Sequence, residues 1–367
     1  GAQFLILHIY FTPLAFAYFL STDVSFSLGI GPFLFVFVNG ILLGYGVEVG
    51  GAVGLEPNIK SFLNFGAYLG FALIIIYSGR YYYFNVMRRA VFLPTPTRVE
   101  PAGVWGARVF MICTAGFVGA LIGAGLEWQL ALPFAALTIM TFLVLSRLIA
   151  ETGLFFMQFH ALPCAILWGL FGARALGPAP LLLMFMFTAV LLIDPREALM
   201  PFVINSLKLV DLGKERIGKA GALSVASVLV AVAVAVPITL YLQYDRGVGK
   251  SDTWANETVP RMPINNMLQV KQRLEAQGNL NEAETTRGWG RFAAMNPKPG
   301  YVAAFAAVLF AVLGCYAARL YLPRWPIHPV LFLFWTSRYV PVGVFAQSFL
   351  VGCLIKVVVV KYGGERG

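Results

Sequence analysis

The stretch QLALPFAALTIMTFLVLSRLIAETGLFFMQFHALP, residues 129–163, decides the fold class. Residues 129–150 are nearly all apolar, and a helix needs about 20 such residues to cross a bilayer. Arg147 and Glu151 stand at the end of this run, and a second apolar run that contains a histidine and a proline follows. The stretch therefore predicts a regular membrane helix joined to an irregular one.

The whole chain has the composition of a membrane protein. Of its 367 residues, 59% are hydrophobic and 12% are charged, whereas soluble domains have about 25% charged residues. The mean hydropathy is +0.77. Apolar runs recur from residue 4 to residue 360, so a cleaved signal peptide does not explain this composition. Because membrane proteins concentrate Lys and Arg in the loops that set orientation, the net charge of +10 does not indicate nucleic-acid binding.

Seven apolar runs are long enough to span a membrane, and three further regions are irregular or short. The seven runs are 4–21, 26–47, 63–79, 103–126, 129–150, 220–244 and 299–322. Residues 153–177 are broken by polar residues and a proline, residues 179–193 are short, and residues 327–360 hold one span after a short apolar piece. We predict an all-α, polytopic transmembrane helix bundle of about nine or ten membrane segments, of which one or two are broken or re-entrant.

The chain divides into three parts. Residues 1–244 predict a transmembrane bundle that includes an amphipathic surface helix at 195–219, where apolar positions recur at helical spacing. Residues 245–298 form the only sizeable polar segment and predict an extramembrane loop with a short helix at Met267–Gln277. Residues 299–367 predict the C-terminal transmembrane segments.

Basic loops predict the orientation of the bundle. Residues 80–100 and 195–219 are rich in Lys and Arg and lie next to membrane spans, so we expect both on the cytoplasmic side. The loop at 245–298 then lies on the non-cytoplasmic side. A glycine pair, Gly119 and Gly123, forms a GxxxG pattern, which allows close approach of helices. We expect this pattern to serve packing within the chain rather than dimerisation.

Arg147 and Glu151 are the first candidate site residues. Their spacing of i and i+4 puts both side chains on one helix face. Charges inside spans usually face the interior of a bundle, so the pair could line a polar cavity on a solute path. In the alternative interpretation, Arg147 extends to the interface and Glu151 only neutralises it. The spacing leaves both interpretations open.

Broken segments supply the other candidates. His160 and Pro163 interrupt one apolar run, and such breaks lie at the binding sites of secondary transporters. The alternative is an ordinary proline kink beside a hydrogen-bonded histidine. His328 lies between two prolines in RWPIHPVLFLFW, residues 324–335, which could dip into a cavity or anchor the chain at the interface. Lys356 is the last candidate, and it is either within the membrane or reaches its surface.

Motifs for catalysis or cofactor binding are absent from the sequence. It has no Walker A, HExxH, GxSxG or Rossmann glycine pattern. Its three histidines lie on separate segments, and their spacing does not support a haem or metal site. We therefore expect no enzymatic activity, no cofactor and no metal. The expected partners are the lipid bilayer and, in addition, other membrane subunits or further copies of the chain, but no nucleic acid.

Several stretches together resemble an uncharacterised family of large bacterial polytopic membrane proteins with paired domains of unknown function. These stretches are TPLAFAYFLSTDVSFSLGI at 12–30, GAYLGFALIIIYSGRYYYFNV at 66–86, SRLIAETG at 146–153, RWPIHPVLFLF at 324–334 and LIKVVVVKYGG at 354–364. The positions that match the motifs of the family are Arg147, Glu151, Gly153, Trp325, Pro326, His328, Pro329, Lys356, Tyr362, Gly363 and Gly364.

The resemblance implies a bacterial cytoplasmic (inner) membrane location and a distant similarity to oligopeptide-type (OPT) transporters. Members of the family are usually longer, so this chain looks like their C-terminal part. The resulting prediction is a secondary-transporter-like protein that moves a polar small solute. The alternative is a non-catalytic structural or scaffolding subunit of a larger membrane protein complex.

Overall fold

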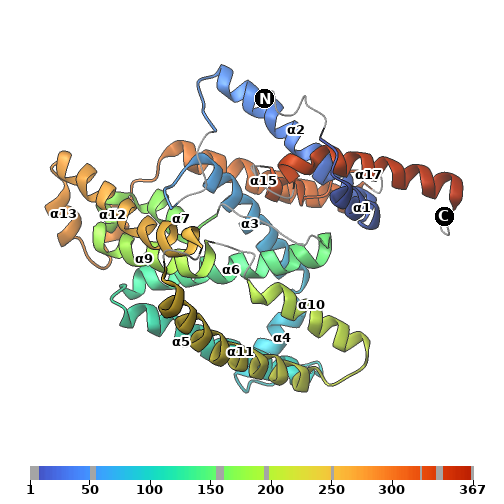
Figure 1. Ribbon diagram of the computed structural model, residues 1–367, viewed down its shortest axis with the longest axis horizontal. Coiled ribbons are helices and arrows are strands. Elements are labelled where there is room, and N and C mark those ends of the chain that lie inside the picture. Colours follow the sequence, from blue (N-terminus) through green and yellow to red (C-terminus); the bar gives the residue numbers. More distant parts are fainter. Residues whose placement is uncertain are drawn as a thin grey trace.

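The structure is a computed structural model that describes residues 8–49, 55–153, 161–193, 198–248, 252–322, 325–335 and 342–364. Over these residues the chain is helical and contains no β-strand (Figure 1), which confirms the predicted fold class. The helices are α1 (Phe11–Phe19), α2 (Thr22–Gly44), α3 (Ile59–Ser78), α4 (Arg80–Ala90), α5 (Pro101–Gly123), α6 (Trp128–Thr152), α7 (Pro163–Phe171), α8 (Ala173–Leu176), α9 (Pro178–Leu192), α10 (Leu199–Leu212), α11 (Ile217–Arg246), the π-helix η4 (Trp254–Thr258), α12 (Val259–Ala276), α13 (Leu280–Thr285), α14 (Gly290–Ala293), α15 (Pro299–Tyr321), α16 (Leu331–Phe334) and α17 (Val342–Gly363).

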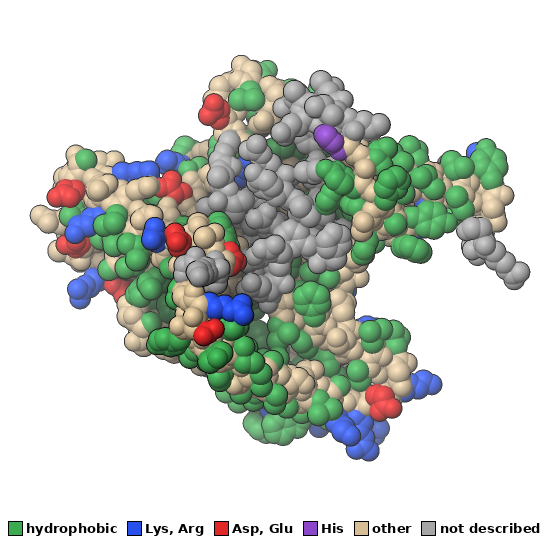
Figure 2. Space-filling model, in the orientation of Figure 1, with side chains coloured by type: hydrophobic (Ala, Val, Ile, Leu, Met, Phe, Trp, Pro, Cys, Tyr) green, Lys and Arg blue, Asp and Glu red, His purple; other side chains and the backbone are tan. Residues whose placement is uncertain are grey.

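Seven of these helices are long and apolar enough to cross a membrane: α2, α3, α5, α6, α11, α15 and α17. Three of the other predicted segments contain shorter helices: α1 and α7 have nine residues each, and α9 has 15. Hydrophobic side chains cover the visible lengths of α11 and α17, whereas charged side chains gather over α12 and α13 and beside the turn between α10 and α11 (Figure 2). The chain is therefore an integral membrane protein.

Five of the seven long helices form two groups that meet through α16. In the α3–α6–α15 group, α3 packs on both α15 and α6, and Gly66 lets α3 approach the backbone of Phe305. In the α1–α2–α17 group, α17 packs on both α1 and α2, and Gly352 lies against the carbonyl oxygen of Leu14. Glycine suits both contacts because a Cβ atom would collide with the facing carbonyl oxygen. The short helix α16 packs on α2 and on α3 and thereby joins the two groups.

The segment after α6 is broken, as predicted. Gly153 ends α6 with a left-handed φ of 64°, which glycine adopts without strain. Pro163 then occupies the first turn of α7, where no N–H donor is needed, and α7 is buried along almost its whole length. Gly172 and Gly177, both with positive φ, separate α7, α8 and α9. The chain thus passes through the interior as short helices instead of one regular span.

Helices lie in both ranges for which the sequence predicts extramembrane helices. The helix α10 lies within the predicted range 195–219, and its position relative to the membrane surface stays a prediction. The helix α12 includes most of Met267–Gln277 but begins earlier, at Val259, because a proline in its first turn costs no hydrogen bond. The side chains of Val270 and Leu274 are buried, and α12 packs on α9. The polar segment is therefore docked on the bundle.

Candidate functional site

A polar cavity lies where α3, α6 and α15 end and where the chain passes through residues 325–330. Its volume is about 270 Å³. Phe71, Ile74 and Ile75 supply apolar lining from α3. The polar lining consists of Ser78, Tyr83, Arg147, Glu151, Tyr316, Arg319 and His328. The structure thus brings three of the six sequence candidates, Arg147, Glu151 and His328, to one site.

Arg147 and Glu151 form the ion pair that their spacing predicts. Nε of Arg147 donates to Oε1 of Glu151 at 2.7 Å, and Nη2 lies 2.6 Å from the same oxygen. The exposed fractions of the two side chains are 57% and 30%. Because one carboxylate oxygen receives both contacts, Oε2 of Glu151 has no hydrogen-bond donor among the described residues. The pair forms an accessible part of the cavity wall.

A second ion pair, which the sequence did not predict, joins the two helix groups beside the cavity. Nη2 of Arg319, near the end of α15, lies 2.8 Å from Oδ2 of Asp23, in the first turn of α2. These positions complement the helix dipoles, which favour acids at the start of a helix and bases at its end. Nη1 of Arg319 is buried and has no hydrogen-bond partner in the described part of the chain.

Two hydrogen bonds hold the backbone and the ring of His328 in place. Its N–H donates to Oγ of Ser27 in α2 at 2.7 Å, and its Nδ1 accepts from the N–H of Val330 at 3.2 Å. A ring nitrogen that accepts a hydrogen bond carries no proton, so in the neutral imidazole the proton is on Nε2. His328 therefore lines the cavity with one N–H donor that its own turn does not use.

Of the other three sequence candidates, Lys356 and Pro163 are not part of the cavity lining. Nζ of Lys356 donates to the carbonyl oxygen of Leu20, which follows α1 directly, so this lysine ties α17 to the α1–α2 turn. Pro163 is buried at the start of α7. His160 lies outside the described residues. Lys356 and Pro163 thus have packing roles in the structure.

Sequence reasoning missed Arg319 and Asp23, although a weak signal was present. Each is a charged residue at the boundary of an apolar run, which is also the feature that singled out Arg147 and Glu151. Unlike that pair, however, Arg319 and Asp23 belong to helices far apart in the sequence. No spacing rule connects such residues, so only the packing of α2 near α15 revealed the pair.

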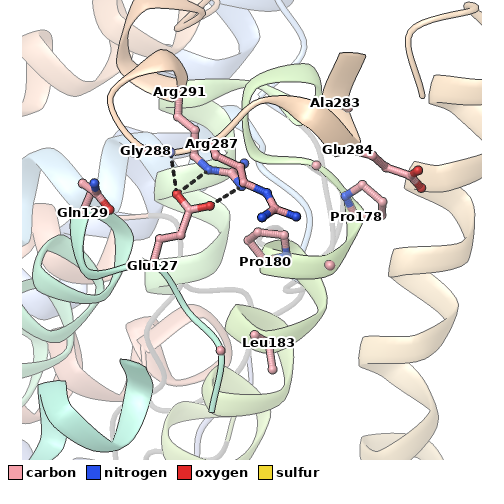
Figure 3. Close-up of a pocket in the computed structure, with 13 residues that line it drawn as sticks. Glu127, Gln129, Pro178, Pro180, Leu183, Ala283, Glu284, Arg287, Gly288 and Arg291 are labelled. Carbon is pink, nitrogen blue, oxygen red and sulfur yellow. Dashed lines mark hydrogen bonds and ion pairs between the residues drawn. The ribbon is translucent and has the colours of Figure 1, made fainter. Parts of the chain in front are cut away.

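A larger pocket of about 600 Å³ lies at the opposite end of α6, between that helix end, α9 and α13. Its wall contains a buried ion pair (Figure 3). Arg291, only 4% exposed, donates through Nε and Nη2 to the two carboxylate oxygens of Glu127 at 3.0 and 2.9 Å. Its Nη1 donates to the carbonyl oxygens of Ala175 and Leu176. This arginine clamps the polar segment to α6 and to α8.

The same contacts shift the acidity of Glu127, which directly precedes α6. Its hydrogen bonds from Arg291, and secondly from the N–H of Gly288, lower the pKa of the carboxyl group, against the opposing effect of partial burial. Glu127 is therefore ionised at neutral pH and fully engaged. We read this end of α6 as a structural clamp and the Arg147 end as the candidate site.

Within the described ranges, no group of three or more His, Cys, Asp or Glu side chains is placed to hold a metal ion.

A family model described as "Family of unknown function (DUF6785)" matches residues 1–367. The comparisons with curated proteins and with solved structures found no match.

Proposed function

We propose that this chain, which belongs to the DUF6785 family of unknown function, is a secondary-transporter-like membrane protein that moves a polar small solute. The observation that carries the proposal is the convergence of Arg147, Glu151, Arg319 and His328 on one cavity at the ends of apolar helices. Charged groups in such surroundings are costly and usually mark solute or ion pathways. The resemblance to oligopeptide-type transporters is a secondary support.

Contacts beside the cavity join the two helix groups and support a moving site. The Asp23–Arg319 ion pair and the hydrogen bond from His328 to Ser27 both connect α2 with the α15 side of the cavity. If the α1–α2–α17 group rocks against the α3–α6–α15 group, these contacts break and the cavity changes its access. Motion of one bundle against another around a fixed site is the usual mechanism of alternating access.

Uptake into proteoliposomes tests the proposal. The panel contains succinate, alanine, glucose and choline, so that each charge class of polar solute is present. We expect uptake of at least one solute by the unaltered protein and its loss in Arg147→Ala and Glu151→Ala. The matched control is Arg174→Gln, because Arg174 is 56% exposed and pairs with Glu282 away from the cavity. Normal uptake by both cavity variants would refute the site.

A second candidate function, a non-catalytic scaffolding subunit, is favoured by uncovered helix faces. A Cβ added at Gly119 or Gly123 of α5 would meet no atom within 4 Å, so our prediction that this GxxxG pattern serves internal packing is wrong. The reason is that α5 packs on α4 and α6 along other faces. The helix α11 has no buried residue. Both faces are free to contact lipid or a helix of another subunit.

The particle mass in lipid nanodiscs distinguishes the two functions. A scaffold is expected as an oligomer or complex that Gly119→Leu dissociates, with no uptake of any solute in the panel. Gly218→Leu, which alters a glycine of α11 that is also uncovered, identifies which helix is the contact. A monomer that takes up solute would exclude the scaffold function.

The proposal also includes the orientation and the host membrane. We place the segment 245–298 on the non-cytoplasmic side of a bacterial inner membrane. The basic helix α4 follows the end of α3 that lines the cavity, whereas Arg291 of the polar segment contacts Glu127 at the opposite end of α6. In a cysteine-free background, Gln277→Cys should react with an impermeant maleimide on intact cells, whereas Arg89→Cys should react only after lysis. The reverse pattern would invert the orientation.

A further inference from the structure

The guanidinium group of Arg319 has a hydrogen-bonding capacity that the protein does not use. One of its terminal nitrogens, Nη2, pairs with Asp23 at 2.8 Å, and the other, Nη1, is buried without a partner among the described residues. A buried N–H group without an acceptor is unfavourable, and folded proteins rarely retain one. Nη1 itself is buried, but Arg319 lines the cavity and its side chain is 33% exposed, so a ligand can reach the exposed part of this side chain.

The rest of the cavity is also richer in donors than in acceptors. His328 offers Nε2–H, because its Nδ1 already accepts from Val330. Hydroxyl groups of Tyr83, Tyr316 and Ser78 share the lining. The lining contains two arginines and one carboxylate, and that carboxylate, Glu151, is already bound to Arg147. Because Asp23 balances the charge of Arg319, the lining complements the oxygen atoms of an anion through its surplus of donors and not through net charge.

We propose that this cavity binds a small organic anion through its carboxylate group, with Arg319 as the anchor. This inference rests on the proposed function and names the substrate class of that site. Arginine binds carboxylates through two parallel hydrogen bonds, which a neutral solute cannot match. The cavity volume of 270 Å³ lies just below the usual range of ligand pockets, about 300–1,000 Å³, so the anion is small.

Asp23 competes with the ligand for the same guanidinium group. A bound carboxylate that reaches Arg319 weakens the ion pair between α15 and α2, which is a contact between the two helix groups. This competition predicts opposite effects for the two partners of the ion pair. Arg319→Gln should weaken anion binding, whereas Asp23→Asn should strengthen it, because it removes the internal competitor and leaves the guanidinium in place.

Binding to the purified full chain in nanodiscs of phosphatidylcholine tests the inference. The probes are succinate as the anion, glucose as the neutral solute and choline as the cation, measured by calorimetry and by the shift in Tm. We expect succinate alone to bind, with affinity reduced about tenfold or more in Arg319→Gln, as for the loss of a charge-assisted hydrogen bond. Arg319→Lys keeps the charge beside Asp23 and is the conservative variant in case Arg319→Gln does not fold. It should bind succinate with intermediate affinity. Arg174→Gln should bind like the unaltered chain.

Each other outcome overturns the inference in a recognisable way. Binding of glucose or choline that is insensitive to Arg319→Gln would refute the assignment of an anionic ligand and leave the transport proposal intact. Binding of no probe, together with no uptake in proteoliposomes, would refute both. The cavity lies at helix ends, so a lipid headgroup could supply the same anionic chemistry. A rise in Tm with phosphatidylglycerol in the nanodisc, but not with succinate, would assign the site to lipid. Weaker succinate binding in Asp23→Asn would exclude the competition.

Discussion

The two ends of α6 each carry an arginine–glutamate ion pair, yet the two pairs differ in almost every physical respect. At the start of the helix, Arg291 is 4% exposed, and its donors reach both oxygens of Glu127 and two backbone carbonyls. At the other end, Arg147 is 57% exposed and contacts one oxygen of Glu151. The two ends are about 37 Å apart, the length of 25 helical residues.

The comparison shows that the use of donors, rather than residue type, separates a structural pair from a candidate site. Each of the three guanidinium nitrogens of Arg291 donates to an acceptor of the protein, so this arginine holds the polar segment against α6. At the cavity end, Nη1 of Arg319 has no acceptor in the described part of the chain. Arg291, whose three guanidinium nitrogens all have acceptors, and Arg319, whose Nη1 has none among the described residues, therefore point to different roles for the two pockets.

The largest expected effect comes from breaking the buried pair. Arg291→Ala leaves Glu127 partly buried without its partner, and loss of one member of a buried ion pair costs about 3–5 kcal/mol. Arg147→Ala should cost less than about 1 kcal/mol, because exposed pairs contribute little. Denaturant unfolding in detergent measures both free energies. Equal losses for the two variants would remove the distinction between the two ends of α6.

A smaller effect is expected at the glycine next to the clamp. Gly177 has a φ of 75° and a ψ of 165°, a region that only glycine adopts readily, and a Cβ there would lie 2.5 Å from the carbonyl oxygen of Ala283. Gly177→Ala should therefore cost about 1–3 kcal/mol. Gly278→Ala is the matched control, because Gly278 also has positive φ but has open space around it. A larger loss of Tm for Gly278→Ala would contradict this explanation.

The smallest effect is a pH dependence at the clamp end. The folded-state pKa of Glu127 is lowered from 4.5, mainly by Arg291, so its stabilising contribution is complete above the unfolded pKa. That contribution is lost as the pH falls below 4.5 and through the folded-state pKa. The difference in Tm between the unaltered chain and Glu127→Gln should therefore shrink on acidification. A difference in Tm that stays constant with pH would show that the charge of Glu127 does not contribute to stability.

The cavity end of α6 was largely predictable from local sequence. The apolar run fixed α6, the i,i+4 spacing predicted the contact between Arg147 and Glu151, and the prolines around His328 predicted a break in the helix. All three signals are local in the sequence and depend on hydropathy, helix geometry and the backbone limits of proline. The clamp end gave no such signal, because Glu127 and Arg291 come from different parts of the sequence.

The local sequence is enough to identify an all-helical membrane protein with broken segments, because hydropathy and helical spacing are local properties. Which charges share a site depends on the packing of the helices. It joined Arg319 with Asp23 and His328 with Ser27, and it assigned Lys356 to the α1–α2 turn. The physical reason is that these contacts depend on how α2, α15 and α17 pack, and packing brings together residues that no sequence spacing relates.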